Sequence, residues 1–226
     1  ADDTAVEHVF EQMQPYLQAG QIIVDFSSLS VNKTIELAQL AAQQQISWID
    51  SPVSGGTLGA EQGSLVIFAG GDAEVIQQLR PVYAPLSQRV TRMGDTGTGQ
   101  ATKICNQLIV AANSTLIAEA VALAAQAGVD TRLLAPALAN GFADSKPFQI
   151  LAPRMATAQY QPVQWKVQTL SKDLQNAVSL ANQYHLDIPI AQRALEQLKN
   201  HQQHGYAEQD LSTIIEQVRH PATTEG

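Results

Sequence analysis

Three short segments of the sequence combine polar side chains with glycines in patterns that suit chemistry on a small anion. The first, DSPVSGG at residues 50–56, directly follows an apolar run. Paired glycines let backbone N–H groups approach a ligand closely, and Ser54 adds a hydroxyl donor. The segment is predicted to bind a carboxylate or a phosphate, although a plain strand-to-loop turn would use the same residue types.

The second segment, GTGQATKICNQ at residues 97–107, places a lysine and two amides on one helix face. Lys103, Asn106 and Gln107 are spaced i, i+3 and i+4, which brings them to the same side of a helix. A lysine there can give or take a proton, and the amides can hydrogen-bond a polar substrate. Lys103 could instead extend to solvent from the helix end, but two amides on an otherwise apolar helix favour a functional face.

The third segment, SKDL at residues 171–174, is predicted to begin a helix. Lys172 at a helix start opposes the helix dipole, so an anionic partner would explain it, with Asp173 capping or orienting it. An exposed ion pair between the two side chains explains the same residues equally well.

Other reactive residue types give weaker signals. His201 and His204 are spaced i, i+3, but no third ligand lies nearby in the sequence, so we predict a solvated helix face and no metal site. Cys105, the single cysteine, is predicted to be a core thiol. Neither a Ser-His-Asp signature nor a Walker loop is present in the sequence.

Up to Gly94, the elements that carry these segments alternate between short apolar runs and helical patterns. This alternation is typical of an α/β layer with a largely parallel sheet. Ser30 and Asp72 are predicted N-caps. The expected strands cover residues 22–26, 46–49, 64–69 and 89–93, and the expected helices cover residues 4–17, 31–45 and 72–83.

Beyond Gly94 only helical patterns follow. Residues 101–127 are predicted to form one helix that is apolar almost all round, buried in a domain or in an oligomer interface. A membrane span is disfavoured because Lys103, Asn106 and Glu119 interrupt the apolar run. Further helices are expected at residues 131–139, 147–158, 172–184, 189–204 and 210–218. We therefore predict an α/β domain over residues 1–95 and an all-helical domain over residues 96–226.

Composition and charge limit the function classes. The 226 residues include 13 basic and 21 acidic side chains, a formal net charge of −8. This charge argues against a nucleic-acid-binding surface and against a polybasic membrane anchor. One cysteine excludes an internal disulfide, and no cationic start precedes an apolar core. We expect a cytoplasmic protein with no nucleic-acid or membrane partner.

Taken in order, the three segments resemble the β-hydroxyacid dehydrogenase family, which includes 3-hydroxyisobutyrate dehydrogenase and tartronate semialdehyde reductase. The matching motifs are DSPVSGG, then GxGQxxKxxN from Gly97 to Asn106, then KDL from Lys172. The resemblance implies a Rossmann-type α/β domain followed by an all-α domain with a long connecting helix. It also implies a reversible oxidation of a small 3-hydroxy acid that depends on NAD or NADP.

The resemblance implies a role for each residue on the substrate side. Lys103 is the expected general acid/base, acting at the hydroxyl or carbonyl oxygen of the substrate. Asn106 is expected to orient the substrate beside it. Ser54, Gly55 and Gly56 are expected to bind the substrate, chiefly through its carboxylate.

On the cofactor side, the resemblance places Ser28 near the nicotinamide ribose and Lys172 against the cofactor and the pocket, supported by Asp173. Family members begin with a strand and a G-x-G-x-x-G turn that binds the pyrophosphate, and this turn is absent from the 226 residues. The Rossmann domain is therefore expected to be N-terminally incomplete. Either the sequence is a fragment of a longer enzyme, which we favour, or this chain has lost the nucleotide site.

An alternative to an enzyme is a non-catalytic module that binds a small acid or mediates oligomerisation and derives from such an enzyme. The joint retention of Lys103, Asn106 and Lys172 favours the enzyme, because a decayed enzyme need not keep all three. The long apolar helix also suggests a homodimer or homotetramer.

Overall fold

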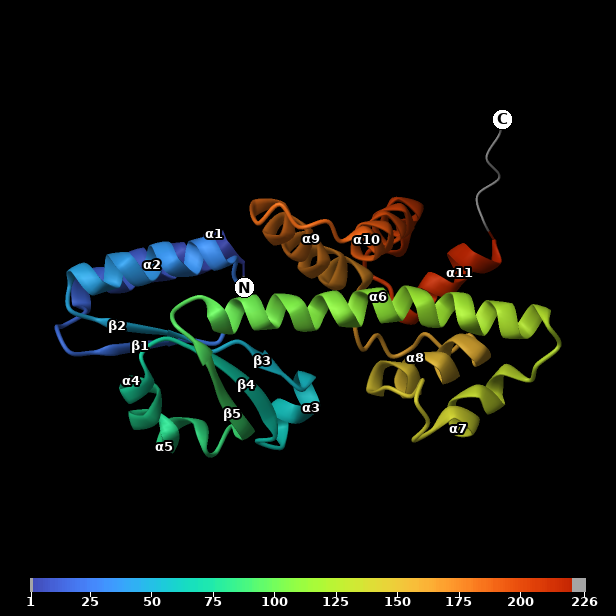
Figure 1. The fold of residues 1–226 in the computed structure, drawn as a ribbon, viewed down its shortest axis with the longest axis horizontal. Helices are drawn as coiled ribbons and strands as arrows, with labels where there is room; N and C mark the ends of the chain where they lie inside the picture. Colours follow the sequence, from blue (N-terminus) through green and yellow to red (C-terminus); the bar gives the residue numbers. More distant parts are fainter. Residues whose placement is uncertain (1, 221–226) are drawn as a thin grey trace. The chain divides into compact units, whose positions relative to one another are not determined.

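The chain divides between Cys105 and Asn106 into two compact units, and the computed structural model describes residues 2–220 (Figure 1). The first unit alternates strands and helices, and the second contains helices but no strand among the residues described. The predicted α/β domain followed by an all-α domain is confirmed. One helix, α6, begins in the first unit and ends in the second.

The first unit is built on a five-stranded sheet. Its strands are β1 (Ile22–Asp25), β2 (Ser47–Asp50), β3 (Val53–Ser54), β4 (Leu65–Gly70) and β5 (Ser87–Gly94). The strand order is β1-β2-β4-β3, and β5 pairs with β4. β1 runs parallel to β2 and β4 runs parallel to β5, whereas β4 is antiparallel to both β2 and β3.

The prediction of a largely parallel sheet is wrong, because the sheet is mixed. Residues 55–64 connect β3 to β4 through the short helix α3 (Gly56–Glu61). A parallel crossover needs about a dozen residues or more, so this shorter connection turns the chain back and β4 runs against β3. β3 and α3 are also missing from the predicted elements.

Helices cover both faces of this sheet. α1 (Asp3–Met13) and α2 (Val31–Gln43) lie on one face, and α4 (Ala73–Gln78) and α5 (Arg80–Tyr83) lie on the other (Figure 1). Successive residues of β2 point to opposite faces of the sheet. Trp48 packs edge-on against Phe10 of α1 on one face, and Ile49 packs with residues of α4 and α5 on the other. Ser30 and Asp72 cap α2 and α4, as predicted.

α6 spans Thr98–Gln126, close to the predicted range, but it is not buried all round. Ile109, Leu116 and Leu123 are 59%, 62% and 71% exposed and recur at seven-residue intervals along one side of the helix. By length and composition the helix could cross a membrane, and 39% of its most apolar stretch is buried inside the protein. Its fully buried side chains include Ala111, Ala118 and Val121. α6 is therefore a packed helix with one exposed apolar side.

Among the residues described, the second unit continues after α6 with five further α-helices and three short helical segments of other types. The α-helices are α7 (Leu134–Leu138), α8 (Lys146–Thr157), α9 (Val167–Gln183), α10 (Pro189–His201) and α11 (Ile214–Arg219). α9 begins at Val167, whose N–H donates to the carbonyl of Gln209 at 3.1 Å and so finds a partner outside the helix. Lys172 therefore lies inside α9, and the prediction that it starts the helix is wrong. The core residues include Leu170, Leu174, Leu198, Leu211 and Ile214.

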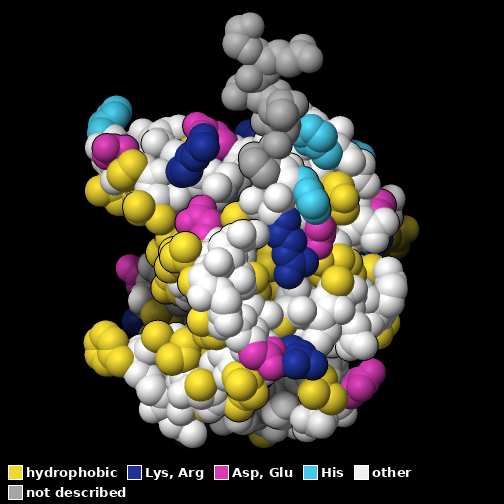
Figure 2. All heavy atoms as spheres, turned by 90° about the vertical axis from the view of Figure 1, so that its right-hand side faces the viewer, with side chains coloured by type: hydrophobic (Ala, Val, Ile, Leu, Met, Phe, Trp, Pro, Cys, Tyr) yellow, Lys and Arg dark blue, Asp and Glu magenta, His cyan; other side chains and the backbone are white. Residues whose placement is uncertain are grey.

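Figure 2 views the side of the molecule on which α7, α8 and α11 lie. Hydrophobic and polar side chains are mixed on this face, and Lys and Arg side chains lie apart from one another (Figure 2). Arg132 pairs with Asp130 at 2.8 Å and Arg219 with Glu216 at 3.1 Å. Carboxylates thus partly neutralise the basic groups of this unit.

Candidate active site

The glycine pair after β3 forms an exposed turn. Ser54 ends β3 and is half-buried, and Gly55 and Gly56 follow with φ of +130° and +65°. Side chains with a Cβ rarely adopt such values, so the turn depends on glycine at both positions. The predicted anion-binding segment is therefore an accessible turn at the β3 edge of the sheet.

A buried carboxylate ties the end of β2 to the start of α6. Asp50 is fully buried, and its Oδ1 accepts a hydrogen bond from the Gly97 N–H at 2.8 Å. Its Oδ2 accepts another from the Gln100 N–H at 2.9 Å. Burial raises the pKa of the Asp50 carboxyl above its usual range, against the opposing effect of these two hydrogen bonds. Asp50 thus fixes the first turn of the helix that carries Lys103.

Glycines make room for this carboxylate. A Cβ at Gly70 would lie 2.5 Å from Oδ1 of Asp50, and a Cβ at Gly99 would lie 2.7 Å from Oδ2 and 2.4 Å from the carbonyl oxygen of Phe68. Neither position admits a side chain without a shift of the backbone or the carboxylate. The close approach of β4 and α6 to Asp50 therefore rests on these two glycines.

Gln100 holds the loop that carries Ser28. Its Nε2 donates to the Ser27 carbonyl at 2.8 Å, and its Oε1 accepts from the Leu29 N–H at 3.2 Å. Gln100 is fully buried, and Ser28, between its two partners, is half-buried. The loop after β1 and the first turn of α6 are thus one hydrogen-bonded assembly. The sequence analysis missed the roles of Asp50 and Gln100. For Asp50 a signal was available, because an acidic residue directly follows the predicted buried strand.

The predicted helix face is present on α6. Lys103 and Asn106 lie one turn apart and are half-buried, and Gln107 is buried. Cys105 is exposed, so the prediction of a core thiol is wrong. It lies two residues beyond Lys103 and therefore points to a different side of the helix, which here faces solvent.

A chain of hydrogen bonds joins this face to α9. Nδ2 of Asn106 donates to Oε1 of Gln107 at 2.9 Å, and Nε2 of Gln107 donates to Oδ2 of Asp173 at 2.6 Å. Nζ of Lys172 lies 3.8 Å from Oδ1 of Asp173. Asp173 is only 8% exposed, whereas the Lys172 side chain is 48% exposed. The second and third motifs, distant in sequence, are thus brought together.

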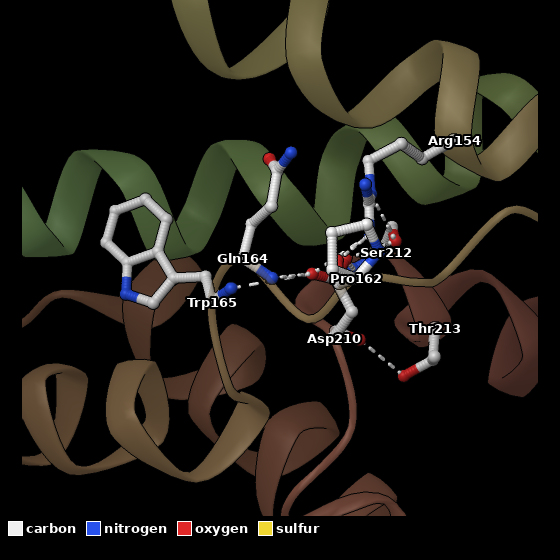
Figure 3. Close-up of polar contacts among 7 residues, drawn as sticks. All are labelled: Arg154, Pro162, Gln164, Trp165, Asp210, Ser212 and Thr213. Atoms are coloured by element: carbon white, nitrogen blue, oxygen red, sulfur yellow. Dashed lines mark hydrogen bonds and ion pairs between the residues drawn. The ribbon is translucent and has the colours of Figure 1, made fainter. Parts of the chain in front are cut away.

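A second buried carboxylate, Asp210, holds the segment that leads into α9 (Figure 3). Its Oδ2 accepts from the Gln164 N–H at 2.8 Å and pairs with Arg154 at 3.3 Å. Arg154 also donates to the Pro162 carbonyl at 2.8 Å, so the segment is held from two sides. Burial opposes ionisation of Asp210, but hydrogen bonds from Ser212 and Gln164 and the Arg154 charge outweigh it and lower its pKa.

One of the two histidines near the end of α10 is buried. His201 is buried and stacks on Tyr206 with ring centroids 4.1 Å apart, so the prediction of a solvated face is wrong for it. Thr213 donates its hydroxyl proton to the Asp210 carbonyl at 2.8 Å, so Nε2 of His201, 2.8 Å from that hydroxyl oxygen, is the donor to it. Among residues 2–220 no three metal-binding side chains gather.

An apolar cavity of about 300 Å³ lies beside α1 and β1. Asp25, Ser27 and Trp48 are its polar lining residues. Oδ2 of Asp25 and Nε1 of Trp48 are buried and find no hydrogen-bond partner within the part of the chain that the structure describes. Such atoms are rare in folded proteins.

Two family models match the chain. Residues 1–94 match the NAD binding domain of 6-phosphogluconate dehydrogenase. Residues 97–218 match the domain described as NAD-binding of NADP-dependent 3-hydroxyisobutyrate dehydrogenase. Together they cover both units.

Similar proteins are oxidoreductases. The chain is 33% identical to 2-hydroxy-3-oxopropionate reductase of Escherichia coli (strain K12), over 87% of this chain and 67% of that protein. It is 29% identical to 2-(hydroxymethyl)glutarate dehydrogenase of Eubacterium barkeri, over 88% of this chain and 66% of that protein. The chain thus spans about two thirds of the length of these relatives.

Solved structures share the fold. A 3-hydroxyisobutyrate dehydrogenase from Salmonella typhimurium superposes with a TM-score of 0.86 at 26% identity. The match covers 96% of this chain and 76% of that one. The likeness extends through both the α/β unit and the helical unit.

Proposed function

Because the chain belongs to the β-hydroxyacid dehydrogenase family, we propose that it catalyses the reversible, NAD(P)-dependent oxidation of a small 3-hydroxy acid. The substrate is of the 3-hydroxyisobutyrate or tartronate semialdehyde type. One observation carries the proposal: Lys103 and Asn106 lie one turn apart on α6, and hydrogen bonds run from Asn106 to Asp173, beside Lys172. Both matching family models describe NAD-binding domains, which supports NAD(P) as the cofactor.

On the substrate side, Lys103 is the general acid/base. In oxidation its amine takes the proton of the substrate's 3-hydroxyl, and in reduction its ammonium returns that proton to the carbonyl oxygen. The turn at Ser54, Gly55 and Gly56 binds the substrate carboxylate through its hydroxyl and backbone N–H groups. Asn106 orients the substrate so that its hydroxyl faces Lys103.

On the cofactor side, the nicotinamide supplies the hydride chemistry when it is bound. We assign Ser28 to a contact with the nicotinamide ribose. Its loop follows the carboxyl end of β1, where open α/β sheets bind ligands. Gln100 holds that loop through hydrogen bonds to Ser27 and Leu29. Lys172, half exposed beside Asp173, supplies a positive charge toward the cofactor. We assign residues 1–95 to a partial dinucleotide-binding domain and residues 96–226 to a substrate and dimerisation domain.

The test is a lysine substitution in the complete enzyme. Lys103→Ala should abolish turnover of 3-hydroxy acids while NAD(H) or NADP(H) affinity, measured by calorimetry, changes little. Lys146→Ala, an exposed lysine at the start of α8, is the matched control and should keep full turnover. Turnover retained by the Lys103 variant would contradict the catalytic role.

Calorimetry also separates the enzyme from the non-catalytic module. Binding of NAD(H) or NADP(H) by this chain or by a longer form supports the enzyme. Binding of neither cofactor by either form would favour a module that keeps only a small-acid site.

We also propose that the protein self-associates as a homodimer or homotetramer. The exposed row of Ile109, Leu116 and Leu123 on α6 is apolar, and burying such a row against a second copy is favourable. A single cysteine and an acidic composition support the cytoplasm as its compartment.

A further inference from the structure

The hydrogen bonds among Asn106, Gln107 and Asp173 have one direction. An ionised carboxylate only accepts hydrogen bonds, so Gln107 must turn its NH₂ group toward Asp173. The carbonyl oxygen of Gln107 then faces Asn106, which must turn its own NH₂ group toward it. The amide of Asn106 is thereby oriented with Oδ1 away from Gln107.

Burial of Gln107 and Asp173 stabilises this direction of hydrogen-bond donation. Gln107 is 4% exposed and Asp173 8% exposed, so water has little access to replace either partner. The ammonium of Lys172 lies 3.8 Å from the second carboxylate oxygen of Asp173. Reversing the amides would place carbonyl oxygens against a buried carboxylate, which costs the hydrogen bond and adds repulsion.

We propose that Asp173 is a positioning residue that, through Gln107, makes Asn106 a hydrogen-bond acceptor, and that the enzyme therefore favours 3-hydroxy acids with a donor on carbon 2. The inference rests on the proposed function. A carboxylate offers only acceptors, and the 3-hydroxyl gives its proton to Lys103. Carbon 2 is the remaining position of a small 3-hydroxy acid that can carry a hydroxyl or an ammonium group.

The first measurement compares three substrates in the complete enzyme with its cofactor. 2,3-Dihydroxypropanoate carries a hydroxyl on carbon 2, serine an ammonium group, and 3-hydroxy-2-methylpropanoate a methyl group without a donor. We expect kcat/KM for at least one of the first two to exceed that for the methyl acid by about tenfold or more. The better of the two identifies the donor as hydroxyl or ammonium.

Substitutions that keep side-chain shape then test the role of Asp173. Asp173→Asn lets the amides reverse, and Gln107→Glu removes the donor to Asp173. Asp173→Asn should reduce the donor preference toward parity, whereas Gln107→Glu should keep it, because a carboxylate at position 107 still accepts from Asn106. In the double variant the amide at position 173 can donate to the carboxylate at position 107, which again accepts from Asn106, so the preference should return. The double variant also keeps the net charge of the original pair.

Two controls match these changes in charge and residue type. Asp187→Asn alters an exposed aspartate shortly after α9, and Gln175→Glu alters a glutamine on α9 outside the Asn106–Gln107–Asp173 chain. Both should leave the ratio of kcat/KM values unchanged. A merely structural role of Asp173 would lower kcat/KM for all three acids equally, and that result, or a ratio unaffected in Asp173→Asn, would overturn the proposal.

NMR of the side-chain amides tests the orientation without any substrate. The NH₂ signals of Gln107 and Asn106 should move in Asp173→Asn and stay in place in Asp187→Asn. Unmoved signals would overturn the orienting role of Asp173. Failure of all three acids to react would instead overturn the proposed function and the substrate class, while moved signals would still support the orientation of Asn106.

Discussion

The Asp50 carboxylate accepts a hydrogen bond from the backbone N–H of Gln100 at 2.9 Å, which joins the end of β2 to the first turn of α6. Because the pair is buried, Asp50→Ala leaves the N–H groups of Gly97 and Gln100 without their acceptor. We expect the free energy of unfolding to fall by about 3 kcal/mol. Urea unfolding measures this, and Asp95→Ala, at a side chain that is 97% exposed, should change it by less than about 0.5 kcal/mol.

His201 should make stability depend on pH. Burial first, and the nearby His204 charge second, lower the pKa of His201 from 6.5 to about 4. The unfolded chain then binds a proton between these two values that the folded chain does not bind, so stability falls as the pH drops from about 6.5 toward 4. The loss from this group reaches about 3 kcal/mol at the low end.

Unfolding curves of His201→Gln between pH 4 and 7 check this prediction. The variant should lose most of the pH slope, whereas His8→Gln, at an exposed position of α1, should keep it. An unchanged slope in His201→Gln would show that other groups cause the dependence.

Asp210 should change stability in the same direction as His201, but at lower pH. Its pKa is lowered in the folded protein, so its contribution is present above the unfolded pKa of about 3.9 and is lost as the pH falls through the folded value. Asp210→Asn should therefore lower the free energy of unfolding by about 3 kcal/mol at neutral pH, and this loss should shrink as the pH falls below the unfolded pKa of about 3.9.

The exposed Asp130 is the matched control for Asp210. Arg132 lowers its pKa too, through hydrogen bonds at the surface. Solvent screens this pair, so Asp130→Asn should lower the free energy of unfolding much less than Asp210→Asn does at neutral pH. Equal losses of unfolding free energy in Asp130→Asn and Asp210→Asn would contradict the conclusion that burial makes the Asp210 contacts stabilising.

The exposed row on α6 gives a prediction about assembly. Leu116→Glu places a charge in the middle of the row, and light scattering should then give a mass near the 24.3 kDa of one chain. Ile190→Glu, at a 75% exposed position of α10, should keep the larger mass of the unsubstituted protein. A single-chain mass before any substitution would refute the proposed oligomer.

Local sequence signals predicted the elements that have their own apolar pattern. Ile22–Asp25 and Ser47–Asp50 lie in short β-branched or apolar runs, and both were predicted to within one residue at each end. β3 has two residues, and its pairing with β4 defines it, so no local pattern reveals it. The direction of β4 likewise follows from the connection that precedes it.

Long-range hydrogen bonds explain most of what the sequence did not reveal in the candidate site. Gly97 and Asp50 are 47 residues apart, and Gln107 and Asp173 are 66 residues apart. The motifs singled out Gln107 and Asp173, but not the hydrogen bond between them. The start of α9 depends in the same way on the Gln209 carbonyl, to which no feature near Val167 points.

The contact between Gly70 and the Asp50 carboxylate constrains the order in which the two positions can change. A methyl group at position 70 would collide with both carboxylate oxygens and with the Gly99 nitrogen. After Asp50→Ala the first two collisions vanish, so Gly70→Ala should be less harmful in that background than alone. A lineage that keeps Asp50 is thus held to glycine at position 70 by three contacts, and one that loses the carboxylate still has to relieve the 2.8 Å approach to the Gly99 nitrogen before alanine fits.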